Sequence, residues 1–210
     1  LKRFKGTVDK LSGLDSPNAV PVLAYGEHQN QAIVVQEFIE GRTLSEMLKE
    51  SAGLQLNLVL DIAKQIGEYL GALHQVGIAH GGLDTTGIVL AADGNIKVMN
   101  VGLSHGAEVS KLLASKKLDA RPFDAPEVRE GGERTPRSDF YALGAILFQA
   151  LTGETLELDP KVPNSRSQRT GLLPELDELM AKCLHTDPSQ RVQSSAEFLN
   201  GIEEVRLGME

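Results

Sequence analysis

The sequence predicts a mostly helical α+β domain, and three observations lead to this prediction. Apolar residues recur with helical spacing through residues 59–73, a pattern typical of a long helix with one buried face. A run that is almost entirely apolar covers residues 140–151 and predicts a helix buried on all sides. Short apolar segments bounded by turn residues predict strands before and between these helices. Helices beside short hairpins are typical of the α+β class.

The first forty residues predict a helix and a β-hairpin. Four apolar residues are spaced as one face of a helix that ends near residue 13, namely Phe4, Val8, Leu11 and Leu14. Residues 20–26 and 32–37 predict two strands, joined by a polar turn at residues 27–30. Gly41 then breaks the strand pattern.

The next sixty residues predict a short helix, the long helix and a second hairpin. Thr43 and Glu46 have the spacing of a capping box, in which side chains and backbone N–H groups pair at the first turn of a helix. The long helix follows. The dipeptide Asp93-Gly94 is a hairpin turn signal between two short apolar runs, residues 88–90 and 96–99.

The second half predicts helices separated by loops. Residues 101–124 and 154–170 show little regularity and predict loops. Pro174 predicts the start of a helix with four inward residues, Leu176, Leu179, Met180 and Cys183. Ser194 and Glu197 have capping-box spacing and predict the start of the last helix.

Composition and charge exclude several classes of protein. The chain has 210 residues, and its 21 Lys and Arg against 29 Asp and Glu give a net charge of −8. Nucleic-acid-binding domains usually carry a basic face, so this balance argues against nucleic acid as a partner. The single cysteine, Cys183, excludes a disulfide framework and fits a reducing compartment.

The length of the longest apolar run and the single cysteine indicate where the protein is located. The longest apolar run falls short of the roughly 20 residues that a spanning helix needs, so we expect no membrane segment within this chain. We expect a cytoplasmic location, either on its own or as the cytoplasmic domain of a longer, membrane-anchored protein.

Six short segments, in this order along the chain, resemble motifs of a known family. They are Ser16-Pro17-Asn18-Ala19-Val20, Val34-Val35-Gln36-Glu37-Phe38, Leu73-His74-Gln75-Val76-Gly77-Ile78-Ala79-His80, Ala125-Pro126-Glu127, Ser138-Asp139-Phe140-Tyr141-Ala142-Leu143-Gly144 and Asp187-Pro188-Ser189-Gln190-Arg191. Together they resemble the protein kinase fold from its helix αC onward, and in particular the eukaryotic-type Ser/Thr kinases of bacteria. The resemblance implies a truncated N-lobe at residues 1–40, made of helix αC, two strands and the hinge, and a mostly helical C-lobe at residues 41–210.

The resemblance implies structural roles for seven residues. Glu127 and Arg191 should form an ion pair that ties the end of the activation segment to the C-terminal helices. Asp139 should accept hydrogen bonds from backbone N–H groups of the catalytic loop, because an unpaired buried carboxylate is costly. The regulatory spine would consist of four residues, Leu11, Val22, His80 and Val101.

The resemblance also implies that the groups needed for phosphate transfer are missing. The family's αC glutamate falls at Thr7, its catalytic aspartate at Gly82 and its catalytic-loop lysine at Asp84, while its two metal ligands fall at Gly87 and Asn100. Phosphoryl transfer depends on a base and on metal-bound phosphates. Neither the glycine-rich loop nor the phosphate-binding lysine is found among these residues.

We therefore predict a catalytically inactive kinase-like domain, a pseudokinase, that binds ATP and Mg²⁺ weakly or not at all. It would act as a regulatory or scaffolding module in Ser/Thr kinase signalling, with a protein partner such as a kinase or another domain of a longer chain. Phe4 and three basic residues are a candidate interaction surface, the latter being Lys111, Lys116 and Lys117. The alternative is an atypical kinase or a nucleotide-binding switch with displaced groups, in which Asp84 would be a displaced base.

Overall fold

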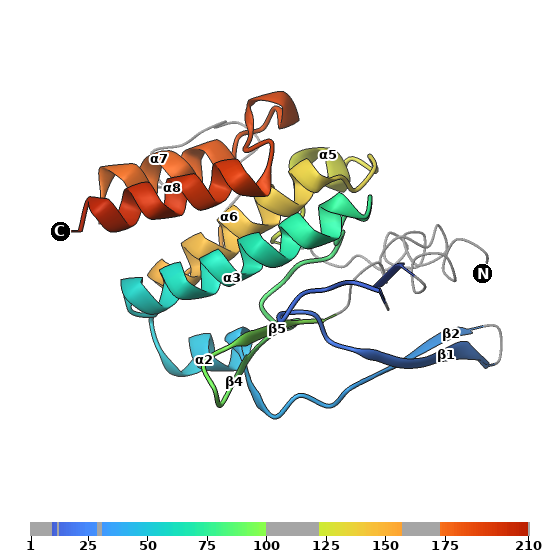
Figure 1. Ribbon diagram of the computed structural model, residues 1–210. Coiled ribbons are helices and arrows are strands. Elements are labelled where there is room, and N and C mark those ends of the chain that lie inside the picture. Colours follow the sequence, from blue (N-terminus) through green and yellow to red (C-terminus); the bar gives the residue numbers. More distant parts are fainter. Residues whose placement is uncertain (1–9, 12, 29–30, 100–121, 157–172, 210) are drawn as a thin grey trace.

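The computed structural model in Figure 1 describes residues 10–11, 13–28, 31–99, 122–156 and 173–209. The predicted α+β class is confirmed, and helices dominate the second half. The elements in chain order are β1 (Val22–His28), β2 (Gln31–Gln36), β3 (Gly41–Thr43), α2 (Leu44–Glu50), α3 (Leu56–Gln75), β4 (Ile88–Ala91), β5 (Ile96–Val98), α5 (Pro126–Arg129), α6 (Pro136–Thr152), α7 (Pro174–Cys183), the 3₁₀ helix η3 (Pro188–Gln190) and α8 (Ser195–Leu207).

The core lies among four helices. Helix α3 packs against α6 and α8, and α7 packs against both α6 and α8 (Figure 1). The helices approach closely at two glycines: a Cβ added at Gly67 would lie 2.8 Å from Cδ1 of Phe198, and one at Gly144 would lie 2.6 Å from Cβ of Cys183. Most of α6 is buried, as the apolar run predicts, because neighbours pack around it on several sides.

The four inward residues predicted for α7 are all buried. Among them, burial raises the pKa of the Cys183 thiol to about 12. The thiol therefore stays protonated and unreactive at neutral pH.

Side-chain caps define several helix starts. At α2 the predicted capping box is present: Thr43 Oγ1 accepts from the N–H of Glu46, and the Glu46 carboxylate accepts from the N–H of Thr43. At α8 only half of the predicted box forms. Ser194 Oγ accepts from the N–H of Glu197, but Glu197 Oε2 accepts from the N–H of Gln193 at 2.7 Å instead of from Ser194. A competing donor one residue upstream therefore replaces the second bond of the box.

Two small antiparallel sheets complete the fold. Strands β3, β4 and β5 form one sheet, and the predicted turn between β4 and β5 contains Gly94 at φ +83°. Strand β3 is too short to stand out in the sequence. It forms because Gly41 lets the backbone approach β4, where an added Cβ would lie 2.4 Å from the carbonyl oxygen of Leu90.

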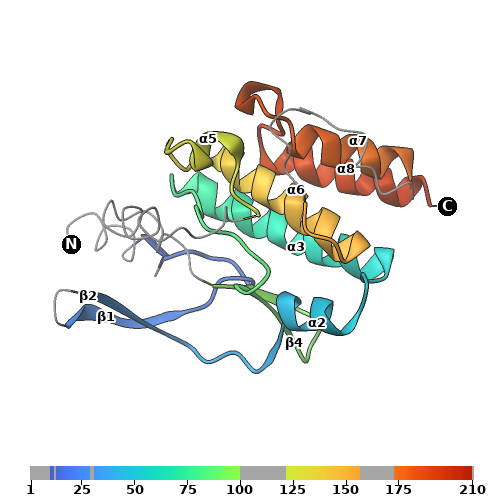
Figure 2. The same ribbon diagram turned by 180° about the vertical axis from the view of Figure 1, so that it is seen from behind.

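Strands β1 and β2 form a separate two-stranded sheet, called the ribbon below, which extends away from the helices (Figure 2). Its ladder runs through Glu27 and His28, which pair with Ala32 and Gln31. The predicted polar turn at residues 27–30 is therefore too long by two residues, since backbone pairing continues through polar side chains.

The first predicted helix and the two predicted loops fall largely outside the described residues. Lys10 and Leu11 are helical, in agreement with the spacing of the apolar residues around them. Residues 100–121 and 157–172 cover most of the predicted loops and are not described further.

Candidate functional site

The loop at residues 80–87 is anchored by Asp139 from the first turn of α6. Asp139 Oδ2 accepts from the backbone N–H of His80, and Oδ1 accepts from the N–H of Gly81, both at 2.8 Å. The predicted backbone acceptor is thus present, and its side chain is 2% exposed. Gly81 adopts φ +70°, a conformation that favours glycine.

The same carboxylate has a third partner that the sequence did not indicate. His74, in the last turn of α3, places Nε2 2.8 Å from Asp139 Oδ2. A single histidine on a helix carries no distinguishing pattern, so the sequence predicts no role for His74. Burial, reinforced by the Asp139 charge, also raises the pKa of the nearby Tyr69 phenol. Asp139 therefore joins α3, α6 and the loop.

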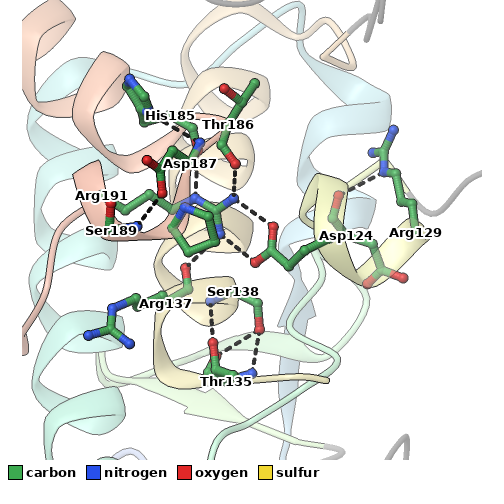
Figure 3. Close-up of polar contacts among 12 residues, drawn as sticks. Asp124, Arg129, Thr135, Arg137, Ser138, His185, Thr186, Asp187, Ser189 and Arg191 are labelled. Carbon is green, nitrogen blue, oxygen red and sulfur yellow. Dashed lines mark hydrogen bonds and ion pairs between the residues drawn. The ribbon is translucent and has the colours of Figure 1, made fainter. Parts of the chain in front are cut away.

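A second polar cluster surrounds Arg191, which is 1% exposed (Figure 3). Its Nη1 and Nη2 donate to the two carboxylate oxygens of Glu127 at 2.6 and 2.7 Å, so the predicted pair forms in bidentate geometry. Nε donates to the carbonyl of His185 and Nη2 to that of Thr186. The guanidinium carbon also lies 5.0 Å from the ring centroid of Tyr141. Arg191 therefore joins α5 to the turn before α8.

A third arrangement, absent from the sequence predictions, holds the residues just before α5. Asp124 accepts a bidentate pair from Arg134 at 2.8 and 3.0 Å, with both side chains about one-sixth exposed. Arg129 donates to the backbone carbonyls of Asp124 and Pro122 at 2.8 and 3.1 Å. Desolvation by burial lowers the pKa of Arg129. Asp124 and Arg134 stand ten residues apart on either side of α5 and follow no periodic pattern, so their pairing is not predictable from the sequence.

Three positions to which the resemblance assigns catalytic groups, 82, 84 and 87, lie in the loop at residues 80–87. Gly82 and Gly87 have no side chain to offer. Asp84 Oδ1 accepts from the N–H of Thr86 at 2.8 Å, from Thr86 Oγ1 at 2.6 Å and from the N–H of Gly87 at 2.9 Å. The Asp84 carboxylate therefore stabilises a turn of its own loop.

The spine residues are only partly described. His80 is buried, its Nε2 lies 3.1 Å from the carbonyl oxygen of Met99, and its ring meets Tyr69 edge to face. Leu11 packs against the core while half-buried, and Val22 is half-buried and pairs with Gln36. The stacking of the spine stays a prediction. Several other predicted residues fall outside the described chain, namely Phe4, Thr7, Asn100, Val101, Lys111, Lys116 and Lys117.

The described residues contain no candidate metal site and no candidate membrane-spanning helix. No group of three or more His, Cys, Asp or Glu side chains is arranged to hold a metal ion in the described part of the chain. Among the described helices, none combines the length and apolar character required to cross a bilayer.

This architecture, with helices packed around α6 and a carboxylate of α6 that holds the backbone of the loop at residues 80–87, is that of a protein kinase domain. The chain belongs to the protein kinase domain family, whose pattern matches residues 7–200. The fold agrees with the solved kinase domain of PknI from Mycobacterium tuberculosis, with a TM-score of 0.77 and 23% identity over 97% of this chain and 77% of that chain.

Curated relatives include bacterial serine/threonine-protein kinases. PrkC of Bacillus subtilis is 27% identical over 211 residues, covering 94% of this chain and 33% of PrkC. PknL of Mycobacterium tuberculosis is 27% identical over 204 residues, covering 91% of this chain and 51% of PknL. The chain thus spans a third to a half of the length of these relatives. Its membership of a family related to bacterial Ser/Thr kinases is confirmed.

Proposed function

We propose that this chain is a pseudokinase domain that binds protein partners and does not transfer phosphate. The proposal is supported by the loop at residues 80–87, in which the backbone is held by hydrogen bonds while a glycine occupies position 82. Asp139 and Gly81 keep its backbone in place, while Gly82 stands where the resemblance puts the general base. A general base typically contributes about 10²–10⁴ in rate, and a glycine cannot accept the proton of an attacking hydroxyl.

The remaining carboxylate of this loop is a poor substitute for the base. Asp84 Oδ1 already accepts three hydrogen bonds from Thr86 and Gly87. Moving it toward a substrate hydroxyl would break those bonds. Gly87, at the position of a metal ligand, provides no oxygen on a side chain. These features support weak or absent binding of ATP and Mg²⁺.

The names of the relatives favour the alternative, an atypical kinase or a nucleotide-dependent switch. Incubation with radiolabelled ATP and Mg²⁺, with generic acceptor proteins and with the chain itself, decides between them. The kinase domain of PrkC is the positive control in the same assay. We expect no label above background. Transfer that Asp84→Asn abolishes would refute the pseudokinase proposal and identify the displaced base.

Nucleotide binding needs a separate measurement, because a switch requires binding without catalysis. Thermal unfolding in millimolar ATP, with and without Mg²⁺, should give the melting temperature of the free chain. A ligand present at 100 times its Kd would stabilise the fold by about 2.7 kcal/mol and raise that temperature clearly. Such a rise without phosphate transfer would favour the switch.

As a pseudokinase, the domain would act by presenting a kinase-like surface to another protein in Ser/Thr kinase signalling. The partner would be a kinase or another domain of a longer polypeptide, and not a nucleic acid, because the net charge is −8. We propose a cytoplasmic location on the ground of the single, buried cysteine.

A further inference from the structure

One peptide group in the turn after α7 is held at both of its ends. Its carbonyl, that of Thr186, accepts from Arg191 Nη2 at 3.0 Å. Its N–H, that of Asp187, donates to His185 Nδ1 at 3.1 Å (Figure 3). The backbone carbonyl of His185 also accepts from Arg191 Nε, at 2.6 Å. His185 thus supplies one acceptor of Arg191 through its carbonyl and orients a second acceptor through its ring.

The hydrogen bond to the ring depends on the protonation state of His185. A ring nitrogen that accepts a hydrogen bond carries no proton, so the single proton of the neutral ring lies on Nε2. A second proton can be added only at Nδ1, where it would face the N–H of Asp187. The side chain is half-buried, so solvent can deliver that proton. Protonation therefore turns the acceptor into a donor and breaks the bond.

Asp187 acts on this ring in two opposite ways. Its N–H requires the neutral ring, whereas its carboxylate attracts a protonated one. The pKa of the Asp187 carboxyl is lowered, first by its hydrogen bonds with Ser189, so the carboxylate is charged throughout the range of pH 5 to 8 in which histidine side chains ordinarily titrate. Each state of the ring thus has a contact that stabilises it, and the pH decides between them.

Other charged groups near the turn come from four helices and have partners of their own. Within the described residues, none of them forms a hydrogen bond or an ion pair with the His185 ring. They are Glu127 of α5, which pairs with Arg191, Arg137 of α6, which donates to Gln193, and Lys182 of α7 with Glu197 of α8, which pair with each other. The carboxylate of Asp187 is therefore the charge that acts most directly on the ring.

We propose that the turn at residues 185–191 is a pH-sensitive element that determines how firmly α5 is held. Near neutral pH the His185 ring keeps the peptide group between residues 186 and 187 in place. When Nδ1 takes a proton from solvent, this peptide group turns and Arg191 loses one of its carbonyl partners. The ion pair that joins Arg191 to Glu127 of α5 is then less well supported. This inference goes beyond the proposed function, because it applies whether or not the domain transfers phosphate.

Amide hydrogen exchange on the whole chain tests the proposal at pH 7.5 and pH 5.5, after correction for the intrinsic pH dependence of exchange. The readouts are the amide of Asp187 and those of residues 128–130, which form the hydrogen bonds of α5. We expect protection at both places to fall by about fivefold at the lower pH, as the loss of one hydrogen bond implies. Nuclear magnetic resonance of the imidazole nitrogens should show the Nε2–H tautomer of His185 at pH 7.5.

Two substitutions of the same residue provide the matched variants. His185→Asn keeps an acceptor that does not titrate, because an asparagine oxygen accepts from the N–H two residues on, and it should keep the protection of the parent at both pH values. His185→Ala removes the acceptor and should show the weaker protection at both. His28→Asn, on strand β1 of the ribbon, removes a histidine elsewhere and should respond to pH as the parent does. Far-UV circular dichroism checks that each variant is folded.

Several outcomes would overturn the proposal. Equal protection of the parent at both pH values, or an Nδ1–H tautomer of His185, would show that the ring does not act as described. The same loss of protection in His185→Asn would mean that another group responds to pH. A response at Asp187 without one at residues 128–130 would mean that the turn does not control α5. If His185→Ala does not fold, the comparison of the parent with His185→Asn still decides.

Discussion

Asp139 and Asp84 both hold the loop at residues 80–87, yet they differ in what their carboxylates contact. Asp139 comes from α6, is buried, and joins the loop to two helices through His80, Gly81 and His74. Asp84 belongs to the loop and, among the described residues, accepts from residues two and three positions on. The long-range carboxylate maintains the fold, whereas the local one stabilises a turn at a position where the resemblance expects chemistry. In this loop the contacts of Asp139 are present next to Gly82, the position where the resemblance implies a catalytic aspartate.

Breaking the ion pair between Glu127 and Arg191 should lower the free energy of unfolding more than breaking any of the contacts considered below. Glu127→Gln leaves a fully buried guanidinium without its counter-charge, and we expect a loss of about 3–5 kcal/mol in the free energy of unfolding. Urea denaturation followed by circular dichroism measures it. Glu68→Gln, at an exposed position of α3, is the control and should change stability little. A loss below about 1 kcal/mol would mean that water or the neighbouring carbonyls replace Glu127.

The two aspartates can be compared directly with the same substitution. Asp139→Asn replaces one acceptor oxygen by a donor and removes the charge facing two N–H groups and His74, so we expect a loss of about 2–3 kcal/mol. Asp84→Asn keeps an oxygen that can accept the same local bonds, and we expect a loss of about 0.5 kcal/mol or less. Equal losses in paired urea titrations would remove the distinction between an anchoring and a local carboxylate.

The pair between Asp124 and Arg134 should contribute less to stability than the contacts of Glu127 and Asp139, because it is partly exposed. Asp124→Asn should cost about 1 kcal/mol and increase amide exchange at residues 122–129. Exchanging the two residues, as Asp124→Arg with Arg134→Asp, should restore part of the protection. If the exchanged protein is no better protected than Asp124→Asn alone, the pair contributes through its particular geometry and not through charge.

A small effect, comparable to that of Asp84→Asn, is expected for Glu197, whose pKa is lowered from 4.5, first by its hydrogen bond with Lys182 and then by that with the Gln193 N–H. A carboxyl with a lowered pKa in the folded state stabilises the fold above its unfolded pKa, and this contribution disappears as the pH falls through the folded value. Lys182 is half-exposed, so the contribution is only about 0.5 kcal/mol. Glu197→Gln should therefore be less stable than the parent at pH 7 and indistinguishable from it near pH 2.

The sequence predicts those parts of this molecule in which periodicity or motif order carries the information. The stripe in α3, the apolar run of α6 and the inward residues of α7 all rest on helical spacing, and all are buried as expected. The contacts of Asp139 and the pairing of Glu127 with Arg191 followed from the order of the family's motifs.

Other features depend on contacts that no local pattern encodes. Asp124 meets Arg134, and His74 meets Asp139, only once the chain has folded. Strand β3 has three residues and owes its existence to its partner β4. The second hydrogen bond expected for the α8 capping box forms with the N–H of Gln193 instead, because two backbone donors compete for the Glu197 carboxylate. Tertiary packing determines these contacts, and the intrinsic preference of each residue for helix or strand does not.

Asp139 accepts hydrogen bonds from main-chain N–H groups, and this has a consequence for which substitutions the loop can accept. An amide N–H is the same in every residue except proline, so the hydrogen bonds from the N–H groups of residues 80 and 81 to Asp139 do not depend on the side chain at position 82. Gly81, with its positive φ, is the constrained neighbour. A chain with this fold can therefore gain or lose a side chain at position 82 and still keep the two hydrogen bonds that place the loop.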